Sequence, residues 1–432
     1  MMNSLDTFNK NRCHIDCLDW ANLHGTLVSL LLDKLLESID HVRFAAVCEE
    51  WRAISKEYNK AKQRWCQKRL LPMLVISSTE SEEKLELYSI PEKKVYKNIE
   101  LPLPLRKSRR CFGSNHDSGG WLTIVDLVEG ELPSLDITLM NPFREEMPPI
   151  HLPLLQSRIR SAKDHQISKV ILCGDPTLNP DCFVVLAITR HERIGKRVYA
   201  IKGLNSDWVY WQFASEISDA IVYNSQIYSV TYERWLQLLD VDKAITKQFF
   251  SGSDTISSTR QGLSCKSTQG DLLLVQRFME PKKDVKNDLH QILWTSSFLI
   301  HKVVFIDRDK KLDRSTPILE DGSPYYTGDG DRSEWVSLLE VENIGDEVLF
   351  VGDNYSFSVL ASDYPGCQPN SIYYTDDSMK CGVHKLNERI PYDMGIFNLA
   401  DKSIRPLCSS LNYSKRNVRP PFWTTTLFNG LC

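Results

Sequence analysis

The stretch KVILCGDPTLNPDCFVVLAITRHERIGKRVYAIKGLNSDWVYWQF, residues 169–213, decides the fold of most of this chain. It contains four short runs rich in β-branched and aromatic residues, at positions 169–173, 182–189, 198–201 and 209–213. Turn-forming Gly, Asp, Asn and Pro residues stand between the runs. Runs of about four to eight such residues between turn signals are typical of β-strands. The stretch therefore predicts consecutive short strands.

The same texture extends outward on both sides, from residue 71 to the end of the chain. Further strand-like runs occur at 73–77, 85–90, 121–126, 137–140, 221–223, 226–230, 272–277, 298–306, 334–341, 347–351, 357–361, 371–375 and 395–398. About twenty short strands over roughly 350 residues are too many for one sandwich and suit a closed radial array. We expect a β-propeller. Internal echoes are irregularly spaced, so the sequence does not predict the number of blades.

Residues 20–70 have a different, helical pattern. One stripe of apolar residues has helical spacing and consists of Leu23, Leu27, Leu30, Leu31 and Leu35; a second consists of Phe44, Val47, Cys48, Trp51, Ile54 and Tyr58. Such spacing predicts amphipathic helices, and Asp40 is placed to cap the second one. We therefore expect an α+β multi-domain protein with a helical module at 18–60, a helical linker at 61–71 and a large all-β domain at 72–432.

Composition excludes several classes of protein. Lys+Arg 52 against Asp+Glu 56 gives a net charge of −4, so no basic field attracts nucleic acid or anionic lipid. The longest apolar runs fall far short of the roughly 20 residues that span a bilayer, and the first residues lack a signal-peptide core. The 12 cysteines are scattered without CxxC pairing, which favours free thiols in a reducing compartment. We expect an intracellular protein with no membrane or nucleic-acid partner.

The search for catalytic or metal-binding residues identifies none. Asp376 and Asp377 are adjacent, so in a strand they point to opposite faces, and a turn is the better interpretation. The Asp-rich segments 307–313 and 329–331 lack the glycine and glutamate that a calcium loop needs. The histidines form no HExxH motif and no zinc-type pairing with cysteines. No catalytic, metal or cofactor residue is assigned, and a propeller hydrolase with a dispersed site stays a third alternative.

Two parts of the chain resemble known families. The spaced leucines followed by VCEEWR at residues 47–52 resemble an F-box. The β region is similar to the plant F-box/kelch-like proteins of the SKIP and KIB kind. The matching stretches are GGWLTIVD at 119–126, ITLMNPF at 137–143, LFVGDNYSFSVLASDYPGCQPNSIYYTDD at 349–377 and PPFW at 420–423. The matches follow the order of the family from the first helix almost to the end of the chain.

The resemblance implies a substrate receptor of a cullin-based ubiquitin ligase. The helical module would dock onto a Skp-type adaptor, and through it a cullin scaffold, while the β domain holds an unknown substrate protein; the chain itself would catalyse nothing. Such a receptor works in the nucleus, the cytoplasm or both. The adaptor-binding positions it implies are Leu23, Leu27, Leu31, Leu35, Val47, Cys48 and Trp51. Any one of them could equally belong to the module's own core, and Trp51 is the strongest single candidate for a binding anchor.

One departure from the F-box pattern leaves a second hypothesis open. Leu23-His24-Gly25-Thr26 stands where the family has Leu-Pro followed by acidic residues. Proline pre-sets the backbone ahead of a helix, so its loss predicts a looser helix start. The alternative is a protein-binding propeller that works without a ligase. No substrate site is assigned, because core packing is the expected role of the tryptophans in the β domain, Trp121, Trp208, Trp211, Trp235, Trp294, Trp335 and Trp423.

Overall fold

The protein has two compact units, residues 1–69 with 428–432, and residues 70–427. Its structure is a computed structural model. The structure describes residues 23–35, 38–61, 71–77, 85–90, 93–99, 110–112, 121–128, 134–141, 148–156, 166–191, 195–204, 206–211, 217–231, 236–241, 245–248, 260–281, 293–307, 334–352, 354–364, 366–375, 393–407 and 421–426.

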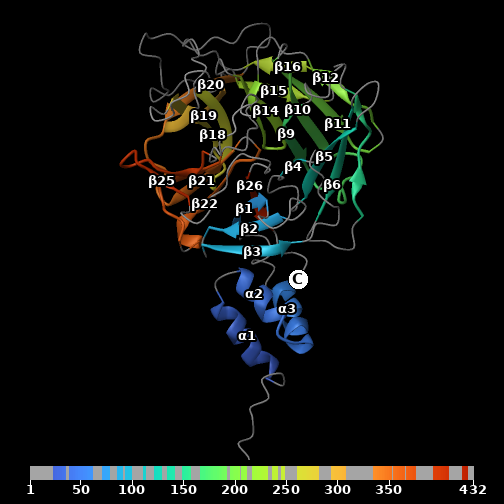
Figure 1. The fold of residues 1–432 in the computed structure, drawn as a ribbon, viewed down its shortest axis with the longest axis vertical. Coiled ribbons are helices and arrows are strands. Elements are labelled where there is room, and N and C mark those ends of the chain that lie inside the picture. Colours follow the sequence, from blue (N-terminus) through green and yellow to red (C-terminus); the bar gives the residue numbers. More distant parts are fainter. Residues whose placement is uncertain are drawn as a thin grey trace, which may run out of the picture. The chain divides into compact units, whose positions relative to one another are not determined.

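The first unit contains three described helices, labelled in Figure 1: α1 (Gly25–Lys34), α2 (Ser38–Ala45) and α3 (Glu49–Ala61). The predicted second helix is thus two helices. Asp40 does not cap it; Asp40 lies in the first turn of α2 and pairs with Arg43 at 2.8 Å. The break comes at Cys48, whose Sγ accepts the backbone N–H of Trp51 at 3.4 Å. A side-chain acceptor at this position begins a new helix, while the apolar stripe continues because both helices supply the same core.

The described residues of the second unit form six sheets. In the order of their strands they are β26 (Phe422–Thr426), β1 (Leu71–Ser77), β2 (Leu85–Ser89) and β3 (Lys94–Ile99); β4 (Arg110–Phe112), β5 (Leu122–Val128), β6 (Ser134–Met140) and β7 (Ile150–His151), with β8 (Leu155–Gln156) also on β6; and β12 (Val209–Trp211), β11 (Gly195–Lys202), β10 (Val184–His191) and β9 (Gln166–Cys173).

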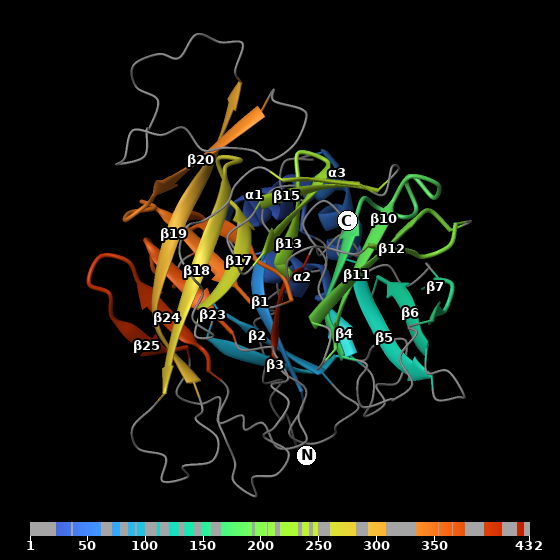
Figure 2. The same cartoon turned by 90° about the horizontal axis from the view of Figure 1, so that it is seen from above.

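The remaining sheets are β13 (Ile217–Tyr223), β14 (Gln226–Thr231), β15 (Leu236–Asp240) and β16 (Ile245–Gln248); β17 (Arg260–Lys266), β18 (Leu272–Pro281), β19 (Leu293–Asp307) and β20 (Glu334–Glu340); and β22 (Phe357–Leu360), β21 (Glu347–Val351), β23 (Ser371–Tyr374), β24 (Gly395–Asn398) and β25 (Ile404–Pro406). Figure 2 shows the sheets following one another around a common centre in chain order. The predicted β-propeller is confirmed, and it has six blades.

The core of the propeller consists of apolar clusters that each combine residues of two consecutive sheets. Phe112, Trp121 and Leu139 pack with Val170 and Val185 in one cluster. Other clusters join the third sheet to the fourth, the fourth to the fifth and the fifth to the sixth. Successive side chains of a strand point to opposite faces of its sheet. Because apolar side chains occupy both faces, each sheet needs a neighbouring sheet on either side.

The ring is closed by strands from opposite ends of the chain. β26 pairs antiparallel with β1, with Trp423 opposite Leu74. The indole N–H of Trp423 donates to the Val351 carbonyl at 3.0 Å, and its ring meets that of Phe350 edge-on at 5.0 Å between centroids. Val351 and Phe350 belong to β21, so this one side chain joins the first sheet to the sixth.

The sixth sheet departs from simple hairpin order. β21 pairs antiparallel with β22 and parallel with β23, because the short 3-10 helix Ala361–Asp363 carries the chain away before β23 begins. The ring of Phe350 stacks on those of Phe357 and Tyr373, with centroids 4.9 Å apart in each pair. The stretch 349–377 contains most of β21 and all of β22 and β23 of this sheet.

Candidate functional site

The three helices share a small apolar core. Its members are Val28 and Leu32 of α1, Phe44 of α2, and Trp51 and Tyr58 of α3. The rings of Phe44 and Trp51 stack with centroids 4.2 Å apart and planes at 21°. The Tyr58 hydroxyl donates to Asp33 Oδ1 at 2.5 Å and so ties α3 to α1. The residues of α1 that belong to this core lie on one side of the helix.

The other side of α1 exposes apolar side chains. Leu27, Leu30 and Leu31 are 51%, 56% and 40% exposed, and Val47, in the turn after α2, is 60% exposed. Positions three and four apart lie on one helical face. This ten-residue helix therefore has leucines on its core side and also on its solvent side. Contiguous exposed apolar patches mark interaction sites, so the solvent side of α1 is a candidate interaction surface. We call Leu27, Leu30 and Leu31 the exposed face.

The seven residues expected at the adaptor interface fall into three groups. Leu27, Leu31 and Val47 are exposed. Leu23, Leu35 and Cys48 are half-buried against the helical core. Trp51 is 9% exposed and belongs to that core. The sequence stripe also contained Leu30, which was not among the seven; its exposure is visible only when the direction of each side chain on α1 is known.

The start of α1 is organised by His24. Its backbone has φ −56° and ψ 133°, and its carbonyl accepts the N–H groups of Leu27 at 2.8 Å and Val28 at 3.2 Å. Its side chain accepts the N–H of Thr26, with 3.4 Å between Nδ1 and the nitrogen, and lies 2.6 Å from the Thr26 hydroxyl. The helix start expected to be loose therefore has a side-chain cap.

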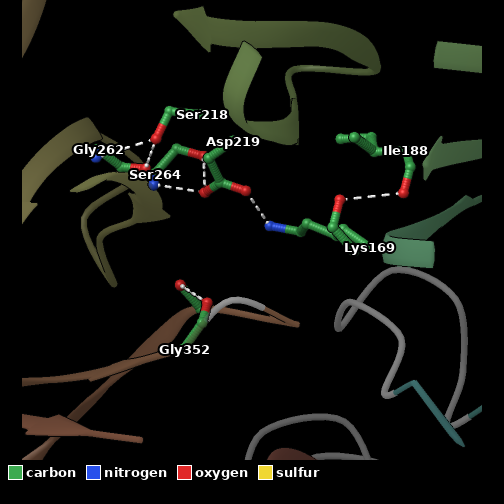
Figure 3. A network of polar contacts seen from close by, with 9 residues as sticks. Lys169, Ile188, Ser218, Asp219, Gly262, Ser264 and Gly352 are labelled. Carbon is green, nitrogen blue, oxygen red and sulfur yellow. Dashed lines mark hydrogen bonds and ion pairs between the residues drawn. The ribbon is translucent and has the colours of Figure 1, made fainter. Parts of the chain in front are cut away.

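A buried polar network joins three consecutive sheets of the propeller (Figure 3). Lys169 of β9 donates to Asp219 Oδ1 of β13 at 2.5 Å, and both side chains are buried. The other carboxylate oxygen, Oδ2, accepts the N–H and the hydroxyl of Ser264 on β17 at 2.7 and 2.8 Å. Ser218 forms two hydrogen bonds with the backbone of Gly262 beside it. Both oxygens of the Asp219 carboxylate accept hydrogen bonds, so the network holds the three sheets together. We call this network the Asp219 clasp.

A second buried network links the fifth and sixth sheets. The guanidinium of Arg277 on β18 donates to Asp393 Oδ2 at 3.0 Å, to Thr295 Oγ1 at 2.7 Å and to the Thr375 carbonyl at 3.1 Å. Its charge lies 5.1 Å from the centroid of the Tyr374 ring. Burial, with a contribution from the Asp393 carboxylate, raises the pKa of Tyr374 above its ordinary range. A phenol that stays in its neutral form is a poor general base.

Several of the described cysteines have free thiols. Cys48, Cys182 and Cys265 are free thiols. Burial raises the pKa of the Cys265 thiol well above its usual value, with further contributions from Glu347 and Asp219. The thiolate is the reactive form, so Cys265 is a poor nucleophile.

The sequence also indicated candidate metal-binding, carboxylate and tryptophan residues. Within the described part of the chain, no group of three or more His, Cys, Asp or Glu side chains could hold a metal ion. Asp376, Asp377 and residues 308–313 and 329–331 lie outside the described residues. Among the described helices, none is long and apolar enough to cross a membrane. Trp121, Trp211 and Trp423 are buried as expected, Trp208 and Trp294 are half-buried, and Trp235 and the side chain of Trp335 lie outside the description.

Comparison with known proteins gives consistent matches. A family model described as the KIB1-4 beta-propeller matches residues 87–398, from within β2 to the end of β24. Two Arabidopsis thaliana proteins align over nearly their whole length: F-box protein At2g17036, 21% identical over 95% of this chain and 95% of its own, and F-box protein SKIP23, 20% identical over 95% and 96%. The WD40 domain of SCAP from fission yeast covers 75% of this chain and 71% of its own at 11% identity; its TM-score of 0.28 carries no argument.

Proposed function

Because the chain belongs to the KIB1-4 β-propeller family, as a plant F-box/KIB-type protein, we propose that it is the substrate-recognition subunit of a Skp–cullin–F-box type ubiquitin ligase. In this proposal residues 18–60 form the F-box, residues 61–71 a linker and residues 72–432 the substrate-binding propeller. The chain carries no catalytic role of its own. It works in the nucleus, the cytoplasm or both, where free thiols such as Cys182 are kept reduced.

The observation that carries the proposal is the exposed face of the helical unit. Leu27, Leu30 and Leu31 point away from a core that is already filled by Val28 and Leu32. Complete burial of a leucine or valine contributes about 1.5–3 kcal/mol, so covering these side chains with a groove of the Skp-type adaptor supplies several kcal/mol. Trp51 acts from within, because its stacking on Phe44 holds α2 and α3 together.

The propeller then acts by tethering. A substrate protein held on the loops of a rigid scaffold has its lysines at a high effective concentration near the conjugating enzyme that the cullin carries. The buried networks around Asp219 and Arg277 support this role, because they join consecutive sheets and so stiffen the scaffold.

The test is binding of the purified full chain to a purified Skp-type adaptor. The double substitution Leu27→Asp and Leu31→Asp should weaken binding at least a hundredfold, because two carboxylates would be desolvated in an apolar groove. The fold should persist, since both positions are exposed. Lys56→Asp, an exposed position on α3, is the matched control and should bind like the wild type. Equal binding of the double variant and the wild type would contradict this docking face.

A second candidate function is a protein-binding propeller without a ligase. It is favoured by His24 and Thr26, which stand where an F-box has proline and an acidic residue. Absence of an adaptor complex at micromolar wild-type concentration, with the double variant His24→Pro and Thr26→Asp restoring one, would support this candidate. Binding by the unaltered chain would exclude it.

A further inference from the structure

The first turn of α1 is intrinsically weak. It begins with Gly25, and glycine loses more backbone freedom on folding than any other residue. Gly25, Thr26, Leu27 and Val28 include no acidic side chain that could interact with the positive end of the helix dipole. The residue that most needs this turn is Leu27, which lies on the exposed face only if the turn is helical.

His24 supplies what this turn lacks. The φ of −56° lies within the range that a proline ring imposes, so the entry to the helix has the geometry that proline would pre-set. The Thr26 N–H donates to Nδ1, and the Thr26 hydroxyl lies 2.6 Å from the same atom. The imidazole therefore acts as the N-cap of α1 through Nδ1.

The cap also lies at the junction between helices. A Cβ atom on Gly25 would come within 3.9 Å of the Ile54 side chain of α3, so the start of α1 rests directly on α3. Loss of the cap would loosen the contact between these helices as well as the first turn. Leu27 would then lose its fixed place relative to Leu30 and Leu31.

We propose that His24, with Thr26, is a positioning residue for adaptor binding: the imidazole caps α1 and so holds Leu27 in the exposed face. This inference rests on the proposed function and deepens it, because it states how an F-box without proline and acidic residue keeps its docking helix. It predicts that the module is competent and not degenerate.

The experiment compares His24→Ala, which removes the acceptor, with His24→Asn, which keeps one. Adaptor affinity of the full chain should fall about fivefold in His24→Ala, the usual effect of losing an N-cap, and stay within about twofold in His24→Asn. His151→Ala is the matched control, because it removes an equivalent imidazole–threonine contact, with Thr138 at 3.0 Å, from the propeller. It should bind the adaptor like the wild type.

Hydrogen exchange of the α1 amides is the second readout. Exchange at Thr26, Leu27 and Val28 should be faster in His24→Ala than in the wild type and restored in His24→Asn. Equal weakening of binding by both variants would overturn the inference, since it would mean that the imidazole itself contacts the adaptor. Unchanged exchange in His24→Ala would overturn it as well. A wild type that does not bind the adaptor would contradict the proposed function, while the exchange data would still decide whether His24 caps α1.

Discussion

At the scale of single residues, the charged side chains of the propeller interior are the most consequential. Lys169 and Asp219 are separated by 50 residues in the chain and stand on different sheets, yet they form a buried pair whose remaining hydrogen bonds reach Ser264. A buried ion pair adds little net stability when both partners are present, but removal of one partner leaves an uncompensated charge. The Asp219 carboxylate is therefore a sensitive position in the fold.

Asp219→Ala should lower the free energy of unfolding of the propeller by about 3–5 kcal/mol, because the Lys169 ammonium would remain buried without a partner. Asp271→Ala is the control. It removes the partner of Lys302 from a half-exposed pair at 2.8 Å and should cost less than about 1 kcal/mol. Urea denaturation followed by tryptophan fluorescence measures both. Similar losses in the two variants would show that the Asp219 clasp is not the buried, saturated network described above.

At the scale of elements, runs of β-branched and aromatic residues between turn signals predicted most of the strands. Each predicted run overlaps an observed strand, from β1 to β24. Of the described strands, the runs missed nine, and several of these have other patterns; the nine are β3, β4, β7, β8, β15, β16, β17, β25 and β26. β16 (ITKQ) and β3 (KVYKNI) are polar, β17 (RQGLSCK) contains a glycine, and β15 (LQLLD) has the leucines of a helix. These strands form because a neighbouring strand offers hydrogen bonds, and that neighbour is not visible in their own residues.

The hairpin between β13 and β14 allows a test at this scale. Asn224 and Ser225 both have positive φ, 49° and 60°, between the paired residues Tyr223 and Gln226. The left-handed region costs a non-glycine residue about 1–2 kcal/mol, and glycine loses about 0.5–1 kcal/mol more backbone entropy on folding. Ser225→Gly should therefore stabilise the propeller by about 0.5 kcal/mol in thermal or urea unfolding.

Gly203→Ala is the control, because it should change the stability in the opposite direction to Ser225→Gly. Gly203 has φ 68°, and a Cβ atom there would lie 2.9 Å from the Asp181 carbonyl oxygen. Gly203→Ala should destabilise the protein by more than Ser225→Gly stabilises it, because strain and a close approach to the backbone add together. Changes of the same sign in the two variants would contradict the turn geometry.

At the scale of the whole propeller, stability depends on ring closure. β26 completes the first sheet, and Trp423 connects it to β21 of the sixth through a hydrogen bond to Val351 and contact with Phe350. Each sheet is buried on both faces only when the ring is complete. Consequently a defect at this junction affects two sheets at once.

Trp423→Ala should cost about 3–5 kcal/mol, as expected for truncation of a fully buried aromatic side chain. Trp208→Ala is the comparison, because Trp208 is half-buried and donates to the Pro153 carbonyl at 2.7 Å, away from the junction. Limited proteolysis should cut Trp423→Ala between the first and sixth sheets before the wild type is cut anywhere. A larger loss of unfolding free energy in Trp208→Ala than in Trp423→Ala would contradict the conclusion that stability depends on the junction between the first and sixth sheets.

The sequence by itself determined the class of the larger unit, the positions of most strands and the two apolar stripes of the helical unit, because all of these follow from residues a few positions apart. It could not separate α2 from α3, since the stripe runs on across the turn at Cys48. It also could not divide the leucines of α1 into a core face and an exposed face.

Only the tertiary structure decided the blade count, the Lys169–Asp219 and Arg277–Asp393 pairs, the closure by Trp423 and the exposure of Leu27, Leu30 and Leu31. Each depends on which distant segments meet. Burial and pairing are properties of the assembled neighbours, and a side chain's own sequence context does not contain them.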